Sequence, residues 1–421
     1  MSDKQIFTAL EVADHEVRLV VGEFYNTRFN IIKVERIPCS GLSYAAVEDE
    51  EAVIAAIRQA ADNARKMLGA DIKKVILSIP SYRTKRYSYK TTVKIEGIDQ
   101  KVTNQDIRNA IKKAESMDIG REYALIQTVC VKYTVNGISS RRIPIGEHCS
   151  EMTAEIDLLC ADRQLSFDLV NCVEKAGLAI MDIFPDVFAV GKEAALFEQA
   201  IDRQVIILKL ERTATTLGLL RKGKLMSSVI LPSGTASLVE NVCSKYNISE
   251  DKAVDLLKYS VRLDQQVYST NPVHLWRENG VTYTINEEEF VNTSRENIEN
   301  WLSAVVKTCV PILKAGETTV IITGEGGETE GLSDLVQKGL ETETRCYIPD
   351  TLGGRNAALT ACLGLFYSYQ DKLPITGYID DSLDMDAFVK AVSYREKKES
   401  GNKEDTLTNK IKTMFLDGKN K

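Results

Sequence analysis

The sequence predicts an α/β protein made of two related lobes, the first of which carries a small α+β insertion. Three observations predict this class. A strand, a short polar turn and a second strand occupy 5–23 and recur at 205–220, about 200 residues later, which indicates an internal repeat. Residues 84–161 interrupt the first half with a different order of strands and helices. The composition, 44% hydrophobic and 27% charged, suits ordinary globular cores.

The first lobe is expected to open with an antiparallel meander, because three β-rich segments are joined by tight polar turns. Apolar residues at spacings of three and four then predict a helix over 50–68, which Gly69 ends. The apolar run 74–79 predicts a buried strand. The three segments of the meander are 5–11, 17–23 and 29–38.

The insertion has the pattern of a compact α+β module. An alternating strand over 87–95 is followed by Thr103 and Asp106, a pair typical of a helix N-terminus, and then by apolar residues at helical spacing. Strands are expected at 124–135 and 151–159.

The second half repeats the meander and then differs from the first. Strands are expected at 205–210 and 216–220, a charge-rich helical section over 235–310, a buried strand at 319–322 and a helix from Leu332. The predicted division of the chain is a first lobe from 1–83 and 162–200, the insertion 84–161, a second lobe 201–370 with a helical subdomain at 235–310, a disordered linker 371–405 and a short amphipathic helix within 406–421.

Charge and cysteine usage exclude several classes of function. The chain carries 53 basic and 60 acidic residues, a net charge of −7, so it has no overall basic field that would attract nucleic acid. Nine scattered cysteines without a CxxC pair and only three histidines predict free thiols and no metal site. The start of the chain lacks the pattern of a signal peptide, and no stretch reaches 18 apolar residues, so a cytoplasmic protein is expected.

Three turns are candidates for a ligand site. The loop 323–331 (TGEGGETEG) follows a strand and precedes a helix, so its backbone could approach a phosphate closely, although a plain turn is the alternative. The other two are the hairpin turns EVADHE and KLERTATT, which would face each other across a cleft between two related lobes. Each carries charged residues where a phosphate-binding turn needs glycine.

The last residues regain apolar character after the linker, without a local core to join. A helix on a membrane surface or in a partner's groove is expected, and a frayed tail is the alternative. The residues that would bind the membrane are Leu407, Lys410, Ile411, Lys412, Met414, Phe415 and Leu416.

Several longer segments, in their order along the chain, resemble one known family. They are VTNQDIRNAIKKAES, the IPIG turn, EMTAEIDLLCAD, NCVEKAGL, VIITGEGGETEGLSDLVQKGL and RNAALTACLGL. The first four resemble the 1C subdomain of FtsA, the bacterial actin-like cell-division family, and its return into the first lobe. The last two resemble the adenosine loop and the closing helix of that family, and the terminal helix resembles its membrane-targeting tail.

This resemblance implies an actin-like two-lobe ATPase fold with an inserted SHS2-like subdomain, and it assigns the three turns to ATP and Mg²⁺. The family's two phosphate loops read Asp-x-Gly-Thr/Ser and Asp-x-Gly-Gly-Gly-Thr, and this chain departs from both. Side chains replace the glycines, carboxylates would repel phosphate, and the metal-positioning acid has become Lys209. ATP is therefore expected to bind weakly or not at all, with at most weak ATPase activity and no catalytic residue. The positions concerned are Glu11, Ala13, Asp14, Lys209, Glu211, Thr213, Gly324, Gly326 and Gly327.

The resemblance also implies partners and a location. The family's helical subdomain faces the C-terminal peptide of FtsZ, which would place Arg295, Phe290 and Ile298 at that contact, with a solvated Arg295 as the alternative. The expected function is a division scaffold that self-associates into actin-like filaments and tethers FtsZ-like filaments to the inner face of the cell membrane at the division site. A PilM-like adaptor of a pilus or secretion machine and a true actin-like ATPase are the alternatives.

Overall fold

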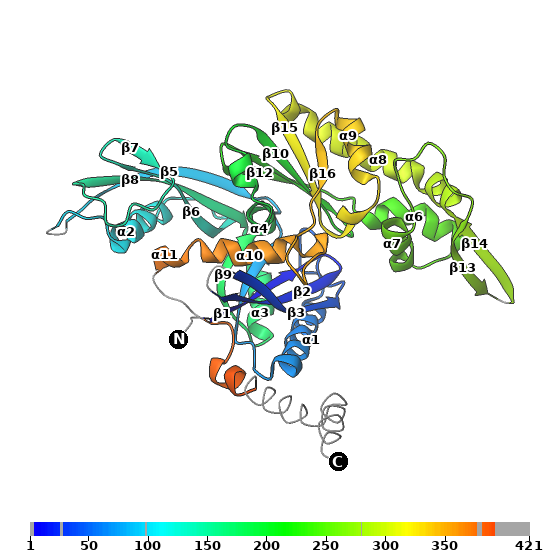
Figure 1. Cartoon of the computed structure of the whole chain (residues 1–421), viewed down its shortest axis with the longest axis horizontal. Helices are drawn as coiled ribbons and strands as arrows, with labels where there is room; N and C mark the ends of the chain where they lie inside the picture. Colours follow the sequence, from blue (N-terminus) through cyan, green and yellow to red (C-terminus); the bar gives the residue numbers. More distant parts are fainter. Residues whose placement is uncertain (1–3, 26–27, 97–98, 279, 377–380, 392–421) are drawn as a thin grey trace, which may run out of the picture.

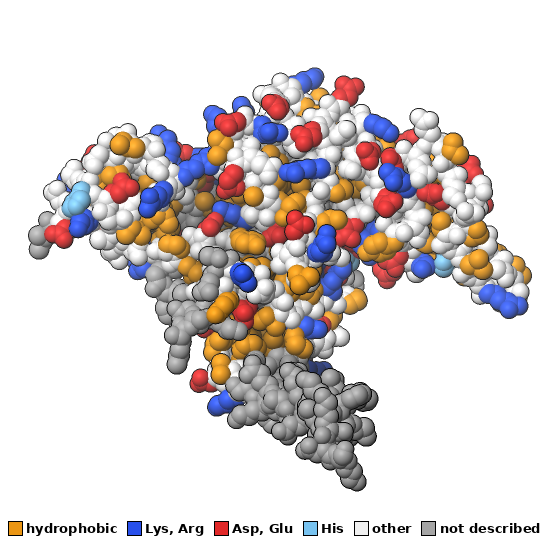
Figure 2. Space-filling view, in the orientation of Figure 1, with side chains coloured by type: hydrophobic (Ala, Val, Ile, Leu, Met, Phe, Trp, Pro, Cys, Tyr) orange, Lys and Arg blue, Asp and Glu red, His pale blue; other side chains and the backbone are white. Residues whose placement is uncertain are grey.

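A computed structural model of the chain describes residues 4–25, 28–96, 99–278, 280–376 and 381–391. Two lobes, each built on a five-stranded sheet, lie one above the other, and the insertion extends to one side of them (Figure 1). Charged side chains of both signs are mixed over the face shown in Figure 2, as the near balance of acidic and basic residues predicts.

The sheet of the first lobe has the order β3-β2-β1-β4-β9. Its first three strands form an antiparallel meander, and β1, β4 and β9 run parallel. Helix α1 (Glu50–Leu68) begins at the Asp49 cap and ends at Gly69 in the left-handed conformation, as the sequence predicts. The strands are β1 (Lys4–Val12), β2 (Glu16–Tyr25), β3 (Arg28–Pro38), β4 (Lys74–Ile79) and β9 (Ala179–Pro185).

The second lobe repeats this arrangement with the order β12-β11-β10-β15-β16. The predicted internal repeat is confirmed, because β2 and β11 occupy the same place, second from the meander edge of their sheets. Alternating side chains of each sheet pack on helices on both faces, which gives each lobe an apolar core. The strands are β10 (Gln204–Leu210), β11 (Thr215–Arg221), β12 (Lys224–Leu231), β15 (Thr318–Thr323) and β16 (Thr344–Cys346).

The insertion has its own four-stranded sheet, of order β5-β8-β6-β7. Helix α2 (Asn104–Glu115) packs on one face of it, and Thr103 and Asp106 form the reciprocal capping box that their spacing predicts. The chain returns to the first lobe through α3 (Arg163–Lys175). The strands are β5 (Lys85–Lys94), β6 (Tyr123–Val135), β7 (Ile138–Ser140) and β8 (Glu151–Asp162).

The section predicted to be a helical subdomain, 235–310, is helical only in part. Helices α6 (Thr235–Tyr246), α7 (Glu250–Tyr259) and α8 (Glu287–Leu313) are present, but a hairpin of β13 (Pro272–Glu278) and β14 (Val281–Asn286) separates them. The prediction was wrong there because these residues alternate with a period of two, and Gly280 turns the chain with a φ of 82°. The hairpin projects from the end of the second lobe (Figure 1).

The predicted end of the second lobe at 370 also needs correction. Helix α10 (Thr360–Gln370) packs against α4 (Asp186–Glu193) and the sheet of the first lobe. The two helices approach closely because Gly364 lacks a side chain; a Cβ there would lie 1.8 Å from the Ala189 carbonyl oxygen. An apolar helix gives no sequence signal of which lobe it covers.

The predicted linker, 371–405, is structured in part. Helix α11 (Leu373–Thr376) follows α10, and residues 381–391 pack on the first lobe. The Ser382 hydroxyl accepts a hydrogen bond from the Thr8 backbone at 2.8 Å, and Leu383 pairs with Ile72. A few apolar side chains within a polar segment were enough for this docking. The rest of the predicted linker and the terminal helix lie outside the described residues.

None of the helices within the described ranges combines the length and the apolar character that crossing a membrane requires.

Three short helices complete the list of elements. They are α5 (Leu196–Gln199) and the 3-10 helices η1 (Glu325–Glu328) and η2 (Ala357–Leu359); α9 (Leu332–Leu340) follows η1.

Candidate functional site

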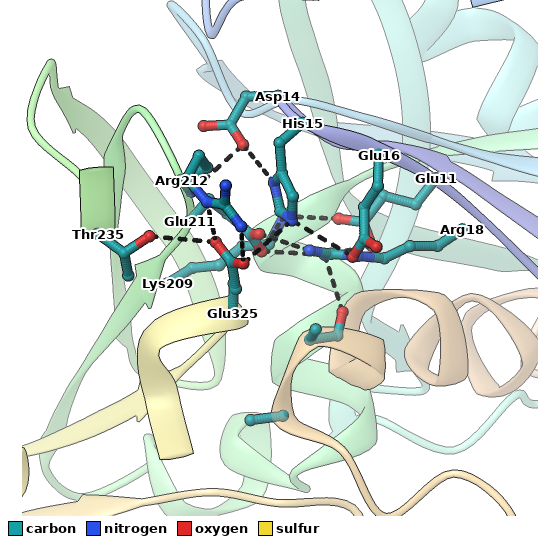
Figure 3. A network of polar contacts seen from close by, with 12 residues as sticks. Glu11, Asp14, His15, Glu16, Arg18, Lys209, Glu211, Arg212, Thr235 and Glu325 are labelled. Atoms are coloured by element: carbon teal, nitrogen blue, oxygen red, sulfur yellow. Dashed lines mark hydrogen bonds and ion pairs between the residues drawn. The ribbon is translucent and has the colours of Figure 1, made fainter. Parts of the chain in front are cut away.

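The two hairpin turns and the glycine-rich loop meet in the cleft between the lobes, as their assignment to one site predicts. The turn between β1 and β2 comes from the first lobe, and the turn between β10 and β11 comes from the second. Helix η1 closes the cleft from the side of the second lobe (Figure 3). Side chains from both lobes fill the space between these three segments.

The guanidinium of Arg18 lies at the centre of the cleft and is fully buried. It donates two parallel hydrogen bonds to Glu211 of the other lobe, from Nη1 to Oε1 at 3.0 Å and from Nη2 to Oε2 at 2.6 Å. It also contacts Glu11 at 3.2 Å and Glu16 at 2.6 Å (Figure 3). Such paired bonds are the strongest contact that an arginine makes with a carboxylate.

The ammonium group of Lys209 makes a second connection between the lobes. It donates from Nζ to Glu11 Oε1 at 2.6 Å and to Asp186 Oδ2 at 2.9 Å, both in the first lobe. Lys209 also lies 3.5 Å from Glu211. We call the charged residues that connect the two lobes here the cleft network; its members are Glu11, Asp14, Glu16, Arg18, Asp186, Lys209 and Glu211.

Asp14 contacts the backbone of the facing turn. Its carboxylate accepts hydrogen bonds from the Thr213 backbone N–H at 2.7 Å, the Thr213 hydroxyl at 2.6 Å and the Arg212 backbone N–H at 3.3 Å. Backbone N–H groups of a turn are the donors that commonly bind anions. In this chain a side-chain carboxylate takes those donors.

Arg212 joins the glycine-rich loop in a further ion pair. It donates from Nη2 and Nε to the two oxygens of Glu325, at 2.6 and 3.0 Å, and also contacts Asp251 at 2.6 Å. Glu325 accepts from the Thr235 hydroxyl at 3.1 Å, and His15 of the first lobe lies 3.4 Å away (Figure 3). The charged residue at the tip of each turn is therefore paired within the protein.

The glycines of the loop serve its packing. A Cβ on Gly326 would lie 2.5 Å from Leu210, and one on Gly324 would lie 2.6 Å from the Leu210 carbonyl oxygen. Gly324 also has a φ of 89°, which disfavours other residues. The close approach of η1 to β10 explains these glycines. The third glycine, Gly327, faces η2: a Cβ added to it would lie 3.2 Å from the Cβ of Ala357.

Little space remains between these side chains. The cavity lined by Glu11, Ala13, Asp14, Lys209 and Glu211 has a volume of about 40 Å³. A volume of this size holds two or three waters, since each needs roughly 10–15 Å³, whereas small-molecule sites usually measure about 300–1,000 Å³. In this conformation the cleft is occupied by the protein itself.

The neighbouring charges favour the ionised forms of Glu211, Lys209, Arg18 and Glu16. Burial would raise the pKa of Glu211, but the Arg18 and Lys209 charges outweigh burial and hold that pKa well below its ordinary value. Burial would lower the pKa values of Lys209 and Arg18, yet the surrounding carboxylates raise both. For Glu16, burial is outweighed by the Arg18 charge and the Arg36 hydrogen bond, which lower its pKa to about 2.

A cation has no evident place in this arrangement. Asp14, His15 and Glu211 are the described residues whose potential ligand atoms lie within 4.8 Å of one another. However, Glu211 is paired with Arg18, Asp14 accepts from Thr213, and Lys209 lies close by. A metal ion would have to displace these partners against the positive charges beside them.

Four residues of the site were missed at the level of sequence, namely His15, Glu16, Arg18 and Asp186. The signal was present for Arg18, which lies within the apolar run VRLVV, where a charged side chain must find a buried partner. Asp186 follows directly after β9 as the first residue of α4, and its side-chain oxygen accepts the Ser81 backbone N–H at 3.0 Å. Nothing local shows that it would reach Lys209.

The predicted partner contact on α8 needs correction. Phe290 is fully buried and Ile298 is nearly so, both within the core of the second lobe, so neither can contact a partner. Arg295 lies on the exposed face of α8 and donates to Asn292 at 2.8 Å. Helical spacing alone did not show that Phe290 and Ile298 lie on the face of α8 that packs into the core, whereas Arg295 lies on the exposed face. The predicted membrane-binding residues 407–416 lie outside the described part of the chain.

Comparison with known proteins finds relatives that align along most of the chain. Residues 83–160 match the family described as the SHS2 domain inserted in FTSA. The chain is 21% identical to a cell division protein FtsA of Bacillus subtilis, over 87% of this chain and 83% of the relative. It is 22% identical to that of Enterococcus hirae, over 99% of both chains. These matches support an FtsA-like protein of the actin-like class.

Likeness to solved structures supports the actin-like fold. A PilM-PilN type IV pilus biogenesis complex matches with a TM-score of 0.57 and 13% identity, covering 85% of this chain and 97% of the other. MreB5 of Spiroplasma citri, bound to ADP, matches with a TM-score of 0.50 and 13% identity, covering 89% and 99%. The predicted actin-like fold with an SHS2 insertion is thereby confirmed.

Replacement of Glu16 by Gln tests the network through its pH dependence. A pKa lowered from 4.5 to about 2 stabilises the folded chain above pH 4.5, and this stabilisation is lost as the pH falls toward 2. Glu16→Gln should therefore lower the free energy of unfolding at pH 7 by up to about 3 kcal/mol, with the difference from wild type shrinking below pH 4.5. Urea denaturation at a series of pH values measures this.

The matched control is Glu50→Gln, which removes an exposed ion pair with Lys175. It should change the free energy of unfolding by less than about 1 kcal/mol. If Glu16→Gln changes the free energy of unfolding no more than Glu50→Gln does, the expected contribution of Glu16 to stability is contradicted.

Proposed function

We propose that the chain is a cell-division scaffold of the FtsA type, which attaches FtsZ-like filaments to the inner face of the cell membrane at the division site. The observation that carries this proposal is the SHS2 match at 83–160 together with the FtsA relatives, named cell division proteins, that align along most of the chain. Self-association into actin-like filaments and recruitment of other division proteins belong to the same proposal. A PilM-like adaptor shares the fold, but the family match favours division.

The proposal includes a cleft that closes without nucleotide. ATP and Mg²⁺ do not fit the residues present, because Arg18 and Lys209 both pair with Glu211 and these side chains fill the space. Asp14 takes the backbone donors that a phosphate would need, and a phosphate beside that carboxylate would be repelled. These contacts support a scaffold that has lost the nucleotide dependence of the fold, against the alternative of a true actin-like ATPase.

Calorimetric titration with ATP tests this part of the proposal. The full chain should give no binding isotherm at micromolar ATP, with or without Mg²⁺, because the buried ion pairs would have to be broken first and their carboxylates exposed to phosphate. A control titration with MgCl₂ alone should also give no heat beyond dilution. Micromolar affinity that requires Mg²⁺ would overturn the proposal of an eroded site.

The filament partner is proposed to bind the exposed face of α8. Arg295 is available there, whereas its apolar neighbours are not. Arg295→Glu should weaken binding of an FtsZ-like C-terminal peptide by at least about tenfold, since arginine is favoured at the centre of such contacts. Fluorescence anisotropy with a labelled peptide measures this. Lys307→Glu, on the exposed side of the same helix, is the matched control, and equal affinities of the two variants would count against the contact.

The C-terminal segment is proposed to bind the membrane through Leu407, Ile411, Met414, Phe415 and Leu416. Each partly buried apolar side chain contributes less than the roughly 1.5–3 kcal/mol of full burial, and each lysine near an anionic surface adds about 1 kcal/mol. The sum is weak for one chain, so attachment should depend on several tails acting together on a filament.

Replacement of Phe415 by Glu tests the membrane contact. In sedimentation with anionic vesicles, Phe415→Glu should abolish co-sedimentation of the full chain, because a charge in the interface opposes insertion. Thr413→Glu adds the same charge away from the apolar face at helical spacing and should retain binding. Undiminished sedimentation of the Phe415 variant would exclude the tail as the membrane anchor, while leaving the FtsA-type fold and the partner contact untouched.

A further inference from the structure

One hairpin of the second lobe reaches from the cleft to the insertion. Strand β11 begins at Thr215, directly after the cleft turn, and ends at Arg221, where a tight turn leads into β12. Seven residues of antiparallel strand span roughly 24 Å. Strand β11 is hydrogen-bonded to β10 on one side and to β12 on the other, so its two ends move together as part of one sheet.

The far end of this hairpin is bound to the insertion. Arg141 donates from Nη2 to the Lys222 carbonyl oxygen at 2.9 Å, and Lys224 pairs with Glu155 and lies 3.7 Å from Asp157. The approach is close because Gly223 has no side chain and a φ of 67°; a Cβ there would lie 2.3 Å from Arg141. We call this contact the insert joint; it comprises Arg141, Glu155, Asp157, Lys222, Gly223 and Lys224.

The near end of the hairpin is bound to the first lobe through the cleft network. The turn that precedes β11 carries Glu211, which pairs with Arg18, and Thr213, which donates to Asp14. The same hairpin is thus attached to two different parts of the molecule at its two ends.

Between these ends the hairpin rests on the first lobe. Gly218, in the middle of β11, packs over Val187 of α4, and a Cβ on Gly218 would lie 3.1 Å from Val187 Cβ. Helix α4 begins at Asp186, a member of the cleft network. A strand that is supported at its centre and tied at both ends cannot tilt at one end without moving the other.

We propose that this hairpin is a lever that couples opening of the cleft to movement of the insertion. Breaking the cleft network frees the second lobe to rotate about Gly218, and the same rotation strains the insert joint; by thermodynamic reciprocity, breaking the joint loosens the cleft. The joint also lines a groove of about 900 Å³ between the insertion and both lobes. The width of that groove should therefore change when the hairpin moves. The proposal does not depend on the membrane or filament partner.

Hydrogen–deuterium exchange of the full chain tests the coupling in both directions. The double change Arg141→Ala and Lys224→Ala should speed exchange at 211–215 by at least about tenfold, although none of those residues contacts the joint. Conversely, Glu211→Gln should speed exchange at 221–225 by a similar factor. Gly218→Ala should speed exchange at both ends, because the new methyl group presses on Val187.

Two comparisons keep the result interpretable. Lys175→Ala breaks an exposed ion pair within the first lobe and should leave exchange at both ends of the hairpin unchanged. If the double variant does not fold, Lys224→Glu alone should speed exchange at 211–215, and adding Glu155→Lys should restore the wild-type rate. Exchange that rises only at the mutated end in each variant, with the β1 peptides still protected, would overturn the lever.

Discussion

The ion pair between Arg18 and Glu211 restricts how the two lobes can meet. Both side chains are buried, and each comes from a different lobe. A buried charge without a partner costs several kcal/mol, so the lobes are held in positions where these two residues touch. Glu11, Glu16 and Lys209 then complete the pairing of the remaining charges. The pair fixes an arrangement more than it adds stability, since replacement of both partners by apolar residues is often neutral.

The pairing between the lobes also determines which groups occupy the cleft. Between the two turns, a carboxylate accepts the backbone donors of the facing turn and a guanidinium lies between the lobes. The glycines of the loop 323–331 are explained by the close packing of η1 on β10. Glycines in such a loop therefore do not by themselves indicate a ligand, because the packing of the neighbouring strand is sufficient to require them.

The duplicated meander explains why one hairpin can connect two distant contacts. In each lobe the second strand lies inside the sheet, flanked by strands on both sides. In the second lobe that strand ends in the cleft on one side and at the Gly223 turn on the other. Because the insertion lies beside that turn, β11 borders both the cleft and the insertion.

Alternation, helical spacing and caps were sufficient to predict both meanders, α1 and the capped α2, because these depend on neighbours a few residues apart. The grouping of the three turns came from the internal repeat and the family resemblance. The pairing of Arg18 with Glu211, the return of α10 to the first lobe and the docking of Leu383 on Ile72 were not predictable in this way. The same holds for the inward orientation of Phe290. Each joins residues far apart in the chain, and nothing in the local pattern of a segment records which distant surface it will cover, because burial and charge pairing are settled only when the whole chain has folded.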